Sequence, residues 1–257
     1  MCLATLDQGA TTEHLADRLH FARPSFGRAG LILSGSRLAD MITLYGFKTI
    51  FEGGAGETKD LRAQWALEEI GLPYQVHALD QVAGDLESEA YGRISPFHQV
   101  PVIDDEGFVV AESAAIVLYL AEKAGKLIPS DVQGRTRVVQ WCFAAVATIS
   151  PSFQDLDLLD IFDKENQKLR AEFTKLAHRW LTDLERRLAD REWIACAEFT
   201  VADVMMAGVL RMVRKTDLMN PYSKITDYYA RCFARPAWER TLRMYAERFG
   251  VDVDEIR

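Results

Sequence analysis

A candidate ligand site lies where an acid and a serine precede an apolar segment. Glu112 and Ser113 stand directly before residues 114–124, whose composition predicts a helix. Free amides at the start of a helix, together with the Ser113 hydroxyl, can hold a carboxylate, and the Glu112 carboxylate can hold an ammonium group. The pair therefore predicts a site for a small peptide-like ligand. The alternative is that both residues serve only the start of the helix.

A proline upstream provides a second feature of this site. Pro101 stands among apolar residues that otherwise predict a strand, although proline donates no ladder hydrogen bond. Either Pro101 occupies an edge position, or a cis Val100–Pro101 bond forms a tight turn that leads into the strand. The exposed backbone before Pro101 can pair with an extended peptide in the way that an added strand does.

These residues must be positioned by a hairpin and a small set of elements before it. Residues 104–107 (Asp-Asp-Glu-Gly) predict a hairpin turn, and residues 108–111 predict the returning strand. Upstream, a strand, a helix, a strand and a short irregular helix are predicted at 41–45, 61–70, 74–79 and 86–91. The first strand is expected to end at Gly46 and the first helix at Gly71. This order predicts a parallel unit within a β-α-β-β-α domain.

The second half of the chain is predicted to be entirely helical. After a linker at 124–134, helices are expected at 135–155, 165–190, 200–216, 222–234 and 236–248. Thr200 and Asp203 form the pattern of a capping box, with Phe199 as the preceding apolar residue. Residues 1–40 show no sustained periodicity and no secretory signal, so a disordered extension or an upstream start is expected there.

The composition limits the kinds of partner. The chain of 257 residues is 49% hydrophobic and carries a net charge of −8, which argues against nucleic acid or an anionic membrane as the main partner. The longest apolar run, around 138–149, is far too short to span a membrane. The four cysteines are scattered without metal-ligand spacing, so a reducing cytoplasm and no metal cofactor are expected.

A resemblance to a known family extends these inferences. The run QVPVIDDEGFVVAESAAIVLYLAEK, residues 99–123, resembles the second half of the thioredoxin-like domain of cytosolic glutathione transferases of the bacterial type. The resemblance extends over most of residues 41–257 and includes the capping box. It implies an α/β thioredoxin-like domain at 41–123 followed by an all-α helical domain at 135–250. Glutathione would serve as the co-substrate, without a metal.

The resemblance also implies roles for individual residues. In that family the residue before the cis-proline pairs with the cysteinyl backbone of glutathione, and an acidic-Ser pair binds the γ-glutamyl end. Those roles fall on Val100, with Pro101 shaping the turn, and on Glu112 and Ser113. Gln99 occupies a position where a polar side chain often touches the glycyl or cysteinyl part of glutathione. The alternative for Gln99 is an ordinary polar loop residue.

The residue that activates the glutathione thiol is less evident. A free thiol has a pKa of about 8.5, which a hydroxyl hydrogen bond and a helix N-terminus both lower. The family uses a Tyr, or a Ser or Cys at the start of the first helix. Here the loop 46–60 is several residues longer than usual and contains no Ser or Cys. Thr58 falls closest to the position of the serine, but it could equally be the N-cap of the helix. Thr49 and Tyr45 are weaker candidates.

The resemblance implies a glutathione transferase that acts on a small, mostly apolar electrophile. Alternatives are a non-catalytic binding module of this fold, or a glutathione-dependent isomerase, dehalogenase or disulfide reductase. The electrophile pocket is expected between the long loop and the 135–155 helix, including Trp141, Phe143, Ile149 and Phe153. These residues are also typical of helix packing, so none is assigned a substrate role. A homodimer is expected, with Phe97 either contacting the partner or packed in the core.

Overall fold

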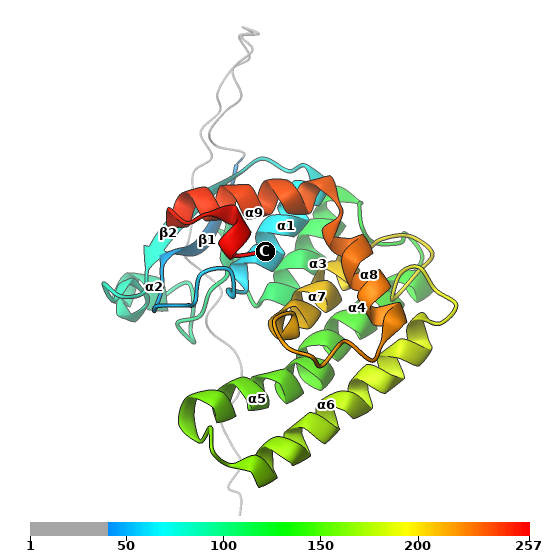
Figure 1. Ribbon diagram of the computed structural model, residues 1–257. Helices are drawn as coiled ribbons and strands as arrows, with labels where there is room; N and C mark the ends of the chain where they lie inside the picture. Colours follow the sequence, from blue (N-terminus) through cyan, green and yellow to red (C-terminus); the bar gives the residue numbers. More distant parts are fainter. Residues whose placement is uncertain (1–40) are drawn as a thin grey trace, which may run out of the picture. The chain divides into compact units, whose positions relative to one another are not determined.

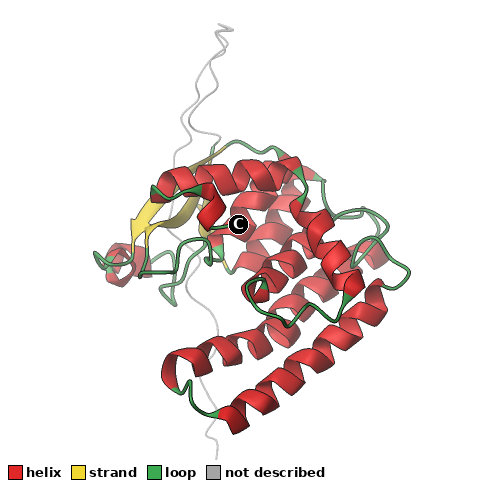
Figure 2. Ribbon diagram, in the orientation of Figure 1, coloured by secondary structure: helices red, strands yellow, loops and turns green. Residues whose placement is uncertain are grey.

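The structure is a computed structural model that describes residues 41–257, so the expectation of a disordered extension at 1–40 lies outside the described residues. Residues 41–257 all belong to one compact unit. Its strands gather in one sheet, and helices make up most of the remainder (Figures 1 and 2). The predicted order of a β-α-β-β-α region followed by a helical region is confirmed.

The sheet has four strands in the order β2-β1-β3-β4. The strands are β1 (Ile42–Thr49), β2 (Tyr74–Asp80), β3 (Val102–Asp105) and β4 (Phe108–Ala111). The pair β1 and β2 is parallel, whereas β1 with β3 and β3 with β4 are antiparallel. This topology places the start of β3, just after Pro101, beside the first strand.

The first strand does not end at Gly46, as the sequence had predicted, but continues to Thr49. A Cβ atom at Gly46 would lie only 2.7 Å from Oδ2 of Asp60. The glycine is therefore required by the close approach of the Asp60 carboxylate rather than by a turn.

The hairpin between β3 and β4 forms where the sequence predicted it. Glu106 and Gly107 both have positive φ, 55° and 90°, as a two-residue turn of the primed kind requires. The Gly107 amide donates to Oδ1 of Asp104 at 2.7 Å. The turn is thus specified by four consecutive residues.

The helices cover the sheet and form the second half of the chain. They are α1 (Asp60–Ile70), α2 (Glu89–Gly92), α3 (Ser113–Ala124), α4 (Val132–Phe143), α5 (Ser150–Phe162), α6 (Gln167–Leu188), α7 (Val201–Leu210), α8 (Ser223–Phe233) and α9 (Pro236–Phe249). Single 3₁₀ turns lie at Asp85–Glu87, Arg211–Val213 and Val253–Glu255. The helix α1 ends at Gly71 with φ of 79°, as predicted.

The helix expected at 200–216 ends at Leu210, and the helix expected at 135–155 differs from the observed one at both ends. The helix expected at 135–155 begins at Val132, because the Asp131 side chain accepts the Gly134 amide at 2.8 Å and caps it. It then continues through a π-helical turn at Ala144–Ile149 into α5, which ends only at Phe162. Pro151 does not stop the helix, since it lies in the first turn of α5, where proline is tolerated.

One hydrophobic core joins the two halves of the unit. Trp65 of α1 is 1% exposed, and its ring centroid lies 5.2 Å from that of Trp238 and 5.8 Å from that of Phe199. Figure 1 shows α9 lying beside α1, and the two helices are in contact. The helical half therefore packs directly against the first helix of the sheet region.

The capping box at the start of α7 is confirmed, and it holds more than its own helix. The buried Asp203 carboxylate accepts the amides of Thr200 and Ile194, each at 2.8 Å. It also accepts the Tyr228 hydroxyl at 2.9 Å. The carboxylate thereby ties the start of α7 to α8 and to the segment before it.

Replacing Asp203 with alanine is expected to lower the free energy of unfolding by about 3 kcal/mol, because the Thr200 hydroxyl, the amides of Thr200 and Ile194 and the Tyr228 hydroxyl lose their acceptor. Urea unfolding at neutral pH measures the change. Asp227→Ala on the exposed face of α8 is the matched control and should change stability by less than about 0.5 kcal/mol. Equal losses in the two variants would contradict this account of Asp203.

Candidate functional site

A cavity of about 300 Å³ lies between the sheet region and the helical region. It brings together the five residues for which the resemblance implied a part in glutathione binding: Gln99, Val100, Pro101, Glu112 and Ser113. The remaining lining residues come from the start of α1, the segment before Gln99, the end of β4 and the α4–α5 region: Lys59, Arg62, Ser95, Pro96, Phe97, Ala111, Val146, Ser150 and Gln154.

The backbone before Pro101 is available to a ligand. The Val100–Pro101 peptide bond is cis, the second of the two arrangements expected for this proline. Tyr91 and Ser95 hold the turn by donating their hydroxyls to the Gln99 carbonyl oxygen, each at 2.9 Å. Within residues 41–257, the Val100 amide and carbonyl form no hydrogen bond. An extended peptide can therefore pair with Val100 as an added strand.

The start of α3 offers donors and an acid to the same cavity. The first backbone bond of this helix runs from the Ile116 amide to the Glu112 carbonyl at 2.9 Å, so the amides of residues 113–115 precede the helical ladder. Ser113 is buried, whereas the Glu112 side chain is exposed and forms no ion pair with another described residue. These groups can receive a carboxylate and an ammonium respectively.

Glu112 has an unusual backbone conformation, with φ of 71° and ψ of 117°. Positive φ is costly for a residue with a side chain, and such strain persists mainly where the surrounding structure enforces it. Here it turns the chain from β4 into α3 and brings the Glu112 side chain to the edge of the cavity.

Gln99 and Phe97 lie on the exposed side of the cavity. The Gln99 amide nitrogen donates to the Phe97 carbonyl oxygen at 3.3 Å. The Phe97 side chain is 78% exposed, so the alternative that it packs in the core is wrong. Its contact with a partner subunit stays a prediction.

Thr58 does not cap α1. The N-cap position is Lys59, and no side chain caps the helix there. Instead, Oγ1 of Thr58 lies 2.8 Å from the hydroxyl oxygen of Tyr245, which also accepts the Gly56 amide at 3.2 Å. The Tyr245 oxygen accepts a hydrogen bond from the Gly56 amide, so the Tyr245 hydroxyl can donate its own proton to Thr58. The Asp60 carboxylate is a second partner of the Thr58 hydroxyl, and its hydrogen bond with Thr58 opposes the rise that burial causes in the pKa of Asp60.

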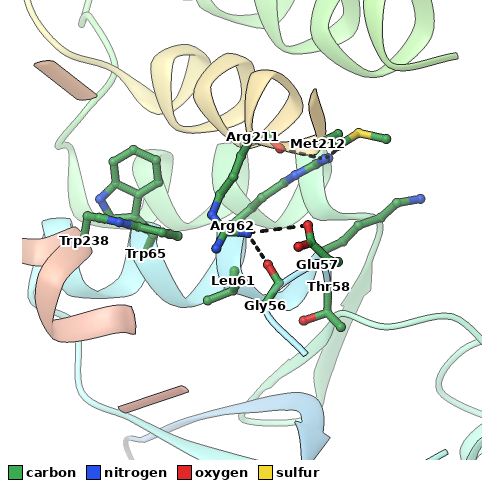
Figure 3. Close-up of a pocket in the computed structure, with 11 residues that line it drawn as sticks. Gly56, Glu57, Thr58, Leu61, Arg62, Trp65, Arg211, Met212 and Trp238 are labelled. Carbon is green, nitrogen blue, oxygen red and sulfur yellow. Dashed lines mark hydrogen bonds and ion pairs between the residues drawn. The ribbon is translucent and has the colours of Figure 1, made fainter. Parts of the chain in front are cut away.

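The structure places Thr58 beside the larger cavity rather than in its wall. Thr58 lines a smaller cavity of about 60 Å³, which shares Lys59 and Arg62 with the larger one (Figure 3). The weaker candidates lie elsewhere. Tyr45 lines a separate cavity with His77, and Thr49 is at the far end of β1 paired with Asp80.

Tyr245 is the site residue that sequence reasoning missed. It is fully buried on α9, and burial raises the pKa of its hydroxyl far above the usual value. No local pattern marks it, because its ring is simply one of several aromatic residues on the apolar face of α9. Its role follows only from the contact between α9 and the loop before α1.

An ion pair holds the start of α1 against α9. Asp60 is 0% exposed, and its Oδ2 accepts Nη2 of Arg248 at 2.9 Å. Arg248 also donates to the Phe47 carbonyl at 2.7 Å and to the Gln64 side chain at 3.1 Å. Burial raises the pKa of Asp60 even though the Arg248 charge opposes the shift.

The long loop before α1 is fastened to the helical half. Arg211 donates to the carbonyl oxygens of Gly56 and Ile256, and Arg214 forms two hydrogen bonds with Glu57 at 2.6 and 2.7 Å (Figure 3 shows Arg211 beside Gly56 and Glu57). Burial alone would raise the pKa of Glu57, but Arg214 and its neighbours lower it. The extra length is therefore held in a defined conformation.

The four residues expected around the electrophile pocket, Trp141, Phe143, Ile149 and Phe153, do not line the larger cavity. Ile149 and Phe153 are buried in the core, and Phe143 is 61% exposed. The α4–α5 region instead presents Val146, Ser150 and Gln154 to the larger cavity, and Trp141 does not line it. The helical wall of this cavity is thus mostly polar, because the aromatic side chains of the segment point elsewhere.

Across residues 41–257, no helix is both long and apolar enough to cross a membrane. Over the same range, no three His, Cys, Asp or Glu side chains gather as metal ligands.

The geometry defines a class of protein: a thioredoxin-like α/β region with a cis-proline turn, joined to an all-α region that completes the cavity. Comparison with known families agrees. The family model described as the glutathione S-transferase N-terminal domain matches residues 61–123, and that for the C-terminal domain matches residues 167–231. The chain belongs to the glutathione S-transferase superfamily.

Individual relatives share about a quarter of their residues with this chain. Glutathione S-transferase hmp2 of Hypomyces subiculosus is 26% identical over 186 residues, covering 67% of this chain and 88% of the relative. The disulfide-bond oxidoreductase YfcG of Escherichia coli is 26% identical over 189 residues, covering 68% and 86%. A glutathione transferase family member from Pseudomonas fluorescens, solved with two glutathione bound, has a TM-score of 0.70 at 26% identity, covering 80% and 94%.

Replacing Arg248 with methionine is expected to destabilise the fold by about 3 kcal/mol at pH 7, because Asp60 would remain buried without its partner. Since the folded-state pKa of Asp60 is already raised, losing Arg248 raises it further. Protonation at lower pH then relieves the unpaired charge, so the loss should be smaller at pH 5 than at pH 7.

Urea unfolding at both pH values measures this loss. Arg243→Met on the exposed face of α9 is the control and should show a small loss, with no such dependence on pH. A loss for Arg248→Met that does not depend on pH would contradict the role of Asp60.

Proposed function

We propose that this protein binds reduced glutathione in the larger cavity and catalyses the attack of its sulfur atom on an electrophile. The observation that carries the proposal is the position of the Val100 backbone, which forms no hydrogen bond within residues 41–257. It lies in the same cavity as Glu112 and the start of α3. An extended tripeptide with one ammonium and one carboxylate at its γ-glutamyl end matches these groups. The Glu112 carboxylate pairs with the ammonium, and the amides of residues 113–115 with the Ser113 hydroxyl receive the carboxylate.

Thr58 is the proposed activating hydroxyl. It lies next to this cavity, just before α1, with its hydroxyl oxygen 2.8 Å from that of Tyr245. A hydrogen bond to the sulfur and the N-terminus of α1 both favour the anion over the thiol. The thiolate then attacks the electrophilic carbon. A carbon–sulfur bond forms, the bond to the leaving group breaks with its electron pair, and the thiol proton passes to solvent.

Reduction of small disulfides is the second candidate function. The similarity to a disulfide-bond oxidoreductase and to a structure solved with two glutathione supports it. Among residues 41–257, no cysteine lines either cavity, so two glutathione molecules would supply both electrons. The products would be two thiols and one glutathione disulfide. Comparing turnover of an activated aryl halide with glutathione-dependent reduction of 2-hydroxyethyl disulfide separates the two functions.

Replacing Glu112 with glutamine is expected to weaken glutathione binding by about 10-fold to 100-fold, because a charge-assisted hydrogen bond to the ammonium is lost. Calorimetric titration measures the affinity. Glu122→Gln, on the same helix but paired with Arg135, is the matched control and should bind glutathione as the unmodified protein does. Unchanged affinity in Glu112→Gln would remove the proposed γ-glutamyl site.

Replacing Thr58 with valine is expected to raise the pKa of bound glutathione by about one unit, since one hydrogen bond to the thiolate is lost. The thiolate absorbance of the complex, followed against pH, reports this pKa. Thr58→Ser keeps the hydroxyl and should retain the lower pKa. If Thr58→Val titrates like the unmodified complex, another group activates the thiol.

A further inference from the structure

A buried arginine without a carboxylate partner lies between the two cavities. Arg62, one turn into α1, is 6% exposed and lines both of them. Its acceptors within residues 41–257 are the Gly208 carbonyl at 3.3 Å and the Met212 sulfur at 4.0 Å, both through Nη2 (Figure 3). Its Nε and Nη1 have no acceptor within the same residues, and neither is among the fully enclosed polar atoms.

The neighbouring arginines differ from Arg62 because the protein supplies their counter-charges. Arg248 is paired with Asp60, and Arg214 with Glu57. Burying a charge without a partner is unfavourable, and burial lowers the pKa of Arg62 to about 10, a value at which it is still charged at neutral pH. Most of the hydrogen-bonding capacity of the Arg62 guanidinium is therefore unused.

A second cation stands beside it. Lys59 also lines both cavities, and no ion pair to it is formed within the described part of the chain. Burial and the like charge of Arg62 both lower the pKa of Lys59. Among the described residues that line the larger cavity, the acid is Glu112, which the proposed function commits to the ammonium of glutathione. The two cations stay uncompensated when that ammonium is bound.

We propose that Arg62, assisted by Lys59, binds a carboxylate carried by the second substrate, so that the preferred electrophile is an anion. A planar guanidinium can form two parallel hydrogen bonds with a carboxylate. The polar Ser150 and Gln154 on the facing wall suit such a substrate better than an apolar one. This inference rests on the proposed transferase function and names the substrate class of that site.

The competing explanation is that Arg62 only stabilises the C-terminus of α7. The Gly208 carbonyl belongs to the last turn of that helix, where a positive charge is favourable. Under that explanation, removing the Arg62 charge would affect anionic and neutral substrates equally.

The test compares two electrophiles that differ in one charge: 4-chloro-3-nitrobenzoate and its uncharged amide. Each rate is divided by the uncatalysed rate with glutathione. The unmodified protein is expected to favour the benzoate by about tenfold or more, as for a hydrogen-bonded charge pair. In Arg62→Met the ratio of the normalised benzoate rate to the normalised amide rate should fall to about one. Arg62→Lys should retain part of the preference for the benzoate.

Arg93→Met supplies the matched control, because it removes one positive charge from an exposed pair at the end of α2, and Arg93 lines neither cavity. It should keep the full preference. A second variant leaves the Arg62 side chain intact: a Cβ at Gly208 would lie 2.9 Å from Cγ and Nε of Arg62, so Gly208→Ala should displace the guanidinium and reduce the preference. Equal loss of both rates in Arg62→Met and Gly208→Ala would overturn the proposal.

A binding measurement separates this proposal from the transferase function itself. Calorimetric titration of the glutathione complex with 4-nitrobenzoate and with 4-nitrobenzamide should show the same preference even if neither chloro compound is turned over. The absence of any preference in binding would overturn the proposal. It would also be overturned if Arg62→Met weakened glutathione but not its glycyl ethyl ester, because the cation would then serve the carboxylate of glutathione.

Discussion

The buried ion pair between Asp60 and Arg248 is the interaction on which the rest of the site depends. The two residues are 188 positions apart, yet their contact fixes where α1 begins relative to α9. Gly46 must lack a side chain to admit the Asp60 carboxylate, and Arg248 also reaches the Phe47 carbonyl. Removing either charge would leave the other uncompensated in the interior, which is more costly than losing an exposed pair.

Further contacts with the helical half explain how a long loop can hold the Thr58 hydroxyl in a defined place. Extra residues before α1 would ordinarily loosen the position of Thr58. Here Arg211, Arg214 and Tyr245, all from the helical half, hold the loop by its backbone and by Glu57. The activating group proposed for the thioredoxin-like region is thus oriented by residues outside that region.

The second half of the cavity takes its character from which side chains the helices turn inward. The aromatic residues of the α4–α5 segment do not line the larger cavity, whose helical wall consists of Val146, Ser150 and Gln154. Opposite them stand the two unpaired cations of α1. A polar, cationic cavity follows from this orientation, although the segment is apolar in sequence.

Local chemistry in the sequence determined the hairpin turn, the end of α1 at Gly71, the capping box of α7 and the Glu112-Ser113 helix start. Each depends on residues within about four positions of one another, so short patterns are enough to specify it. The continuation of β1 through Gly46, the contact of Tyr245 with Thr58 and the unpaired charge of Arg62 were decided only by the tertiary structure. The first depends on the pairing of β1 with β2, and the other two depend on the approach of α9 or α7 to the start of α1. Such contacts between distant segments leave no periodic or local signal in the chain.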